Sequence, residues 1–160
     1  MQAFDFKARY CDWLEANNIP YEYDLEEQIF FFSYGPPPPR SIEILQHLEE
    51  EQFISLCVLA EHLQDGVLYE VQQFINDCNC NLLRGFGSLA VDVQRGTVLW
   101  VMTQVVNAEV GPKEFECYMT VVVDGINKVL PYINVLVRGE ATYEEAKQMM
   151  EEKHREQLQG

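Results

Sequence analysis

The chain has 160 residues, of which 48% are hydrophobic, values that suit one globular domain rather than a disordered segment. Its 26 acidic and 11 basic residues give a net charge of −15, which excludes phosphate backbones and anionic lipid as expected partners. We therefore expect a single domain over residues 1–160, with a core over about 4–150, a polar tail over 151–160, and no nucleic acid or membrane as partner.

The N-terminal sequence MQAFDFKARY shows no secretory signal, and the apolar runs look shorter than the ~18 residues that a membrane span needs. The cysteines form an odd, scattered set, which is typical of free thiols in a reducing cytoplasm: Cys11, Cys57, Cys78, Cys80 and Cys117. Only Cys78 and Cys80 are close in sequence, with no second pair and no histidine nearby. We expect a cytoplasmic protein with no metal and no cofactor.

The first predicted element is a helix over residues 5–17, because four apolar residues recur at helical spacing: Phe6, Tyr10, Trp13 and Leu14. A strand is predicted over Gln28–Tyr34. Both of its faces are apolar, which indicates a strand covered on both sides or one side kept for a partner. The run Pro36–Pro39 is interpreted as a stiff spacer, with a recognition motif as the alternative.

Two more strands are predicted over Ser41–His47 and Gln52–Ala60. The second alternates cleanly between apolar and polar residues. The first could also be a short helix capped by Ser41, but we choose a strand and place the turn at Leu48–Glu51.

A helix and a β-hairpin are predicted over Asp65–Val105, with Asp65 as the N-cap. The buried helix face is a stripe of five residues: Val67, Val71, Phe74, Ile75 and Cys78. Asparagines are expected to end this helix: Asn76, Asn79 and Asn81. After Gly85 the period changes to two, which predicts a strand near 88–93, a turn at Gln94–Thr97 and a strand over Thr97–Val105.

A long helix is predicted from Gly111-Pro112, and its apolar stripe is Phe115, Met119, Val122, Ile126 and Val129. Pro131 should kink or end it, with a short continuation up to Gly139. A capping box formed by Thr142 and Glu145 starts the last helix, whose polar end should fray.

No residue pattern indicates catalysis. In GFGSL, Ser88 lacks the glycine two residues later that a nucleophile elbow requires. Gly85-Phe86-Gly87 precedes a predicted strand, whereas a dinucleotide fingerprint opens a helix. The sequence thus favours a protein that is not an enzyme.

What remains is an excess of apolar residues on two predicted strands. The candidate interface residues are Phe30, Phe32, Trp100 and Met102. Helices covering one sheet face and a second protomer covering the other would explain the excess, and a ligand-binding surface explains it equally well. We expect a homodimer and, beyond it, another protein as a partner.

The order α-β-β-β-α-β-β-α(-α) resembles the YbjN family of small bacterial proteins. The likeness includes the asparagines that end the helix, the pattern G-F-x-x-L-x-V-D over Gly85–Asp92, and the closing R-G-E-A-T-x-E-E-A over Arg138–Ala146. Its structural motif residues here are Asn76, Asn79 and Gly85. The resemblance implies an α+β, type III secretion chaperone-like fold: a curved antiparallel sheet of about five strands with helices on one face, often dimeric. It also implies a role in regulation and no catalytic residues.

Two hypotheses for function follow from the sequence. The preferred one is a non-enzymatic cytoplasmic protein with an interaction, chaperone-like or regulatory role, acting as a homodimer. The alternative is a small-ligand-binding protein or an enzyme whose site forms only in the folded chain. A flat apolar sheet face would favour the first, and a concave polar pocket would favour the second.

Overall fold

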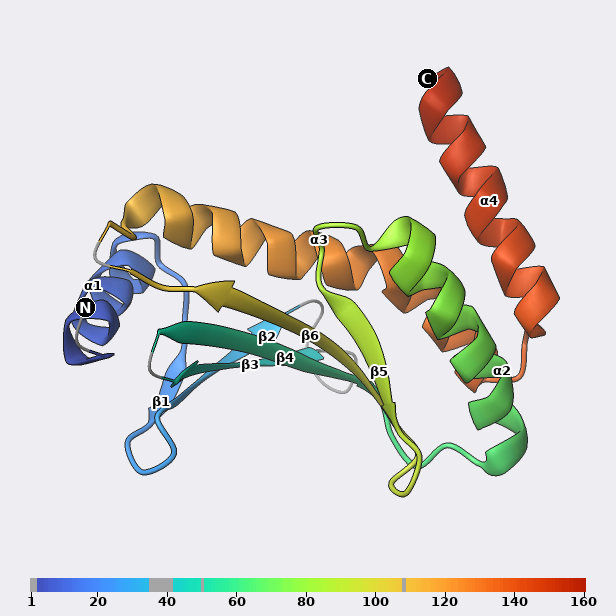
Figure 1. Ribbon diagram of the computed structural model, residues 1–160, viewed down its shortest axis with the longest axis horizontal. Coiled ribbons are helices and arrows are strands. Elements are labelled where there is room, and N and C mark those ends of the chain that lie inside the picture. The colour runs from blue at the N-terminus through green and yellow to red at the C-terminus, as the bar shows by residue number, and fades with distance from the viewer. Residues whose placement is uncertain (1–2, 35–41, 50, 108) are drawn as a thin grey trace.

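The computed structural model describes residues 3–34, 42–49, 51–107 and 109–160, so the Pro36–Pro39 run lies outside the described residues. Its centre is an antiparallel sheet in the order β1-β2-β3-β4-β6-β5 (Figure 1). The strands are β1 (Glu22–Asp24), β2 (Ile29–Tyr34), β3 (Ile42–Glu49), β4 (Gln52–Ala60), β5 (Ser88–Asp92) and β6 (Thr97–Val105). The α+β antiparallel prediction is confirmed, with the short edge strand β1 added to the five expected strands.

The helices are α1 (Ala3–Ala16), α2 (Asp65–Asp77), the π-helical turn η1 (Cys78–Leu82), α3 (Pro112–Val137) and α4 (Tyr143–Gln159). Figure 1 shows α3 running across one face of the sheet, with α1 near one end and α2 near the other. Helix α4 lies outside this layer and contacts α2 and α3 rather than the sheet. The opposite sheet face carries no helix of the described chain.

An aromatic cluster attaches α1 to the sheet and to α3. Phe6 and Tyr10 lie on one side of α1 and are fully buried. The Phe6 ring centroid is 5.1 Å from that of Phe53 on β4, and the Tyr10 centroid is 5.2 Å from Phe30 on β2 and 5.1 Å from Phe115 on α3. Edge-to-face contacts at such distances add to the burial energy of the rings. The predicted helix face is therefore confirmed.

Two polar side chains buried within this core are satisfied by each other and by Tyr10. The Tyr10 hydroxyl donates to Gln46 Oε1, and Gln46 Nε2 donates to Ser55 Oγ at 3.1 Å. Gln46 and Ser55 are fully buried on β3 and β4. Because a buried polar group is costly only when it lacks a partner, this chain of bonds is compatible with the core. Burial raises the pKa of Tyr10, so its hydroxyl remains a donor.

The asparagines were predicted to end the helix, and α2 does end at Asp77, beside Asn76, but the helical path does not stop there. The chain continues past Asn76 and Asp77 into the π-helical turn η1, which reaches Leu82. Asn79 instead pairs with the backbone of β5, because its Oδ1 accepts from Leu89 N–H at 2.8 Å and its Nδ2 donates to Leu89 C=O at 3.0 Å. The side-chain amide of Asn79 thus forms the two hydrogen bonds that the backbone of a neighbouring strand would form, at the start of the hairpin. Gly85 follows with φ of +78°, a conformation that favours glycine.

Helix α3 meets the sheet at a contact that only glycine allows. A Cβ on Gly125 would lie 2.5 Å from the carbonyl oxygen of Phe86 and 2.8 Å from the Trp100 ring. Trp100 is fully buried on β6, and its indole N–H donates to Phe86 C=O at 2.9 Å. Gly87, with φ of +83°, also lies against this ring, since a Cβ there would be 2.6 Å from it. The helix axis can approach the centre of the sheet closely because residue 125 has no side chain.

Two predictions about α3 are corrected by the structure. It is one helix of 26 residues that continues through Pro131 to Val137, so the proline does not end it, while the predicted kink stays a prediction. By length and composition alone it could also cross a membrane, contrary to the prediction that the apolar runs are too short for a span. In the structure it is a core helix, because its buried stripe, which includes Val122, Ile126 and Val129, packs within the core cluster.

Three further predictions concern β3, the capping box and the end of α4. Ile42–Glu49 is a strand, as chosen, and the helix alternative is wrong. The capping box is confirmed, since Thr142 N–H donates to Glu145 Oε2 at 2.8 Å and Glu145 N–H donates to Thr142 Oγ1 at 3.3 Å. Helix α4 does not fray where predicted and extends to Gln159, although residues 151–160 are exposed.

The contact at residue 125 gives a direct test of the packing. Gly125→Ala should destabilise the fold by about 1–3 kcal/mol, because a methyl group there must displace the Phe86 backbone or the Trp100 ring. Gly66→Ala in the first turn of α2 is the matched control, because nothing lies within 4 Å of its added Cβ. The control should be neutral or stabilising by up to about 1 kcal/mol. Urea unfolding of both variants measures the difference, and equal stabilities would contradict the close approach of α3.

Candidate functional site

The candidate site is the sheet face opposite the helices, which we call the open face. Its central row crosses four strands through the register Phe31–Leu45–Leu56–Val101. The adjacent row is Ile29, His47, Ile54 and Thr103, and on the other side Val58 lies opposite Leu99. Because side chains alternate along each strand, these residues point away from the buried positions of the same strands. Apolar side chains thus form one continuous patch.

The apolar residues of the open face are separate from the core. Each is partly exposed, and none belongs to the core cluster or packs against it: Ile29, Phe31, Leu45, Ile54, Leu56, Val58, Leu99 and Val101. Neighbouring side chains on a flat sheet shield one another even without a covering layer, which explains their intermediate exposure. A patch of this kind on a folded chain is typical of an interaction surface.

The predicted interface residues lie on the other face. Phe30, Phe32 and Trp100 are 1%, 5% and 0% exposed beneath the helices, and Met102 packs partly buried against the same core. The excess of apolar residues on β2 and β6 was recognised correctly, but the choice of face was wrong. One residue along β2, Phe31 occupies the open face instead, because alternation moves adjacent residues to opposite faces.

Acidic residues surround the apolar centre. Glu22 lies opposite Phe31 at the β1 edge, Asp24 lies opposite Ile29, and Glu43 lies opposite Ser33. At the β1–β2 end, a hollow of about 510 Å³ is lined in part by Glu22, Phe31 and Glu43. The central rows themselves carry only one titratable side chain, His47, whose Nδ1 lies 3.4 Å from Glu49 Oε1. These acidic side chains therefore lie at the β1–β3 margin of the patch and not within its central rows.

The groups that could support catalysis or bind a metal do not converge. Among the residues that the structure describes, no three His, Cys, Asp or Glu side chains are placed to hold a metal ion. All five cysteines are free thiols. Burial raises the pKa of the Cys57 thiol to about 12, and burial together with the Asp77 carboxylate raises that of Cys78 to about 12. At neutral pH these two thiols are protonated and poor nucleophiles.

The pKa shifts predict two classes of thiol. At pH 8, Cys80 and Cys117 should react within seconds with a thiol reagent such as dithionitrobenzoate, because both are exposed. Cys57 and Cys78 should stay unreacted until the chain unfolds, because they are buried and a pKa of about 12 leaves little thiolate. Stopped-flow labelling with and without denaturant measures this. Equal rates for all five cysteines would contradict the assigned burial.

Comparisons with known proteins place few constraints on this site. No family model matches the sequence, and no curated protein matches it either, so the resemblance to the YbjN family stays a prediction. Among solved structures, the chain is similar to one from the heterodimeric ExoU–SpcU complex of the type III secretion system of Pseudomonas aeruginosa. The identity is 14%, the match covers 75% of this chain and 93% of that chain, and the TM-score is 0.45. The geometry of the open face is therefore the main indication of function.

Proposed function

We propose that this chain is a non-enzymatic protein-binding protein of the cytoplasm, with a chaperone-like or regulatory role, that acts as a homodimer through its open face. The observation that carries the proposal is the continuous apolar patch on four strands, which the core does not use. The free cysteines support a reducing compartment. The resemblance to the YbjN family, in which dimers are common, points the same way.

The size of the open face suits a sheet-on-sheet interface. The six strands hold 40 residues (3, 6, 8, 9, 5 and 9), which at a rise of ~3.4 Å per residue and a strand spacing of ~4.8 Å describe an area of roughly 650 Å². A standard interface buries about 800 Å² on each partner. Two sheets of this kind can pack face to face about 10 Å apart with interdigitating apolar side chains. A second copy of the same face is thus a partner of matching size and chemistry.

The charge of the chain opposes this association without preventing it. A gross apolar term of roughly 20 kcal/mol follows from ~25 cal/mol per Å² over the apolar part of a standard interface. Association costs of about 4–15 kcal/mol reduce that gain. Repulsion between two chains of −15 reduces it further, but salt screens the repulsion between exposed charges. The dimer should therefore tighten as salt is added.

The test is light scattering coupled to size exclusion at low and high salt. We expect a dimer of two 18.6 kDa chains that persists to lower concentration at high salt. Val101→Glu should weaken it by tenfold or more, because a two-fold interface buries the new carboxylate twice. Val93→Glu is the matched control: Val93 follows β5, is 59% exposed, and should leave the dimer unchanged.

Circular dichroism melts of both variants show whether each remains folded. Leu56→Gln provides a second, uncharged change in the central row if Val101→Glu unfolds the chain. A monomer under all salt conditions would contradict the homodimer. The acidic hollow beside Phe31 would then point to a basic segment of another protein as the partner.

A further inference from the structure

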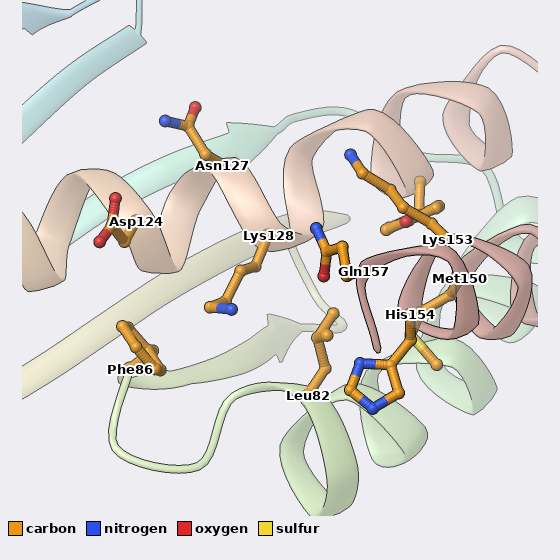
Figure 2. A pocket seen from close by; sticks show the side chains of 10 residues that line it. Leu82, Phe86, Asp124, Asn127, Lys128, Met150, Lys153, His154 and Gln157 are labelled. Atoms are coloured by element: carbon orange, nitrogen blue, oxygen red, sulfur yellow. The ribbon is translucent and has the colours of Figure 1, made fainter. Parts of the chain in front are cut away.

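A second hollow lies between η1, α3 and α4, remote from the open face. Its volume is about 300 Å³, and Figure 2 shows side chains from all three elements around it. Lys128 comes from α3, and Lys153 and His154 come from α4. Leu82, Phe86 and Met150 supply apolar walls. The lining of the hollow thus combines basic side chains with apolar side chains.

The concentration of basic groups is unusual for this chain. The whole sequence has 11 lysines and arginines and 3 histidines, against 26 acidic residues. Two of those lysines and one histidine line this single small hollow, against one lining carboxylate, that of Asp124. Within the described residues, neither Lys128 nor Lys153 forms an ion pair with a carboxylate. With histidine counted as neutral, the two lysines and the one carboxylate that line the hollow give it a small positive charge, in a chain whose net charge is −15.

The packing of α4 positions the helix that carries Lys153 and His154. The Tyr143 hydroxyl donates to Asp77 Oδ2 at 2.5 Å, and its backbone N–H donates to Glu70, both on α2. Met150 is buried one turn before His154, which fixes the rotation of the helix. On α3, the Lys128 ammonium lies 4.7 Å from the centroid of the Phe86 ring, where a cation–π contact restrains it. These contacts position the backbone of α4 and restrain the Lys128 ammonium, whereas the side chains of Lys153 and His154 are exposed.

We propose that this hollow binds a small amphipathic anion, with its phosphate or carboxylate head at Lys128, Lys153 and His154 and its apolar body against Leu82, Phe86 and Met150. Lysine ammonium groups bind such heads as point charges with three donors each. A volume of about 300 Å³ is at the small end of ligand pockets, which limits the body to about the size of one aromatic ring. The site is independent of the homodimer, because it uses no residue of the open face.

The test is an NMR titration of the full chain with phenyl phosphate, benzoate, inorganic phosphate and phenol. Phenyl phosphate or benzoate should shift the amide signals of Phe86, Lys128 and Lys153 and should saturate, and the tighter of the two identifies the preferred head. Inorganic phosphate lacks the body and phenol lacks the charge, so both should bind at least about threefold more weakly. A linear response to both amphipathic anions, or equal binding of phenol, would overturn the proposal.

Substitutions of single lysines distinguish binding in this hollow from general attraction by the charge of the chain. Lys128→Met and Lys153→Met keep the alkyl chain and should weaken binding by about three- to tenfold. Lys113→Met changes the net charge equally, but Lys113 lies in the first turn of α3 and does not line the hollow, so it should leave affinity within twofold. Lys153 is exposed, so its variant should fold even if the Lys128 variant does not. Equal weakening by Lys113→Met would overturn the site.

Discussion

The close approach of α3 to β6 at Gly125 and Trp100 is the constraint on which the rest of the structure depends. The helix can cross the centre of the sheet because residue 125 has no side chain, and the indole N–H of Trp100 closes the contact by binding Phe86 C=O. Phe115 at the start of the same helix then lies within reach of Tyr10, so α1 is held as well. One long helix thus organises the covered face.

The same constraint determines what is left uncovered. With all covering helices on one side of the sheet, the alternate residues of β2, β3, β4 and β6 have no partner within the described chain. Phe31, Leu45, Leu56 and Val101 line up across these strands because the register is antiparallel and nearly without irregularity at the centre. A sheet whose two faces are both apolar favours two covering layers, and the described helices supply one of them.

The charge distribution separates two surfaces with different chemistry. Acidic residues such as Glu22 and Glu43 lie at the margin of the open face, whereas Lys128 and Lys153 gather at the junction of α3 and α4. Helix α4 creates that junction without touching the sheet. The protein can therefore present an apolar face to a protein and a basic hollow to a small anion without one surface interfering with the other.

The sequence by itself determined most of the elements, since helical spacing and alternation are local properties that short windows display. It could not determine which of two apolar faces of β2 is covered, and Phe30 was taken for an interface residue although it lies in the core. It did not indicate that Asn79 pairs with Leu89, or that Lys128 and Lys153 line the same hollow. These contacts form between segments far apart in the chain. The spacing of residues within a single helix or strand does not predict them.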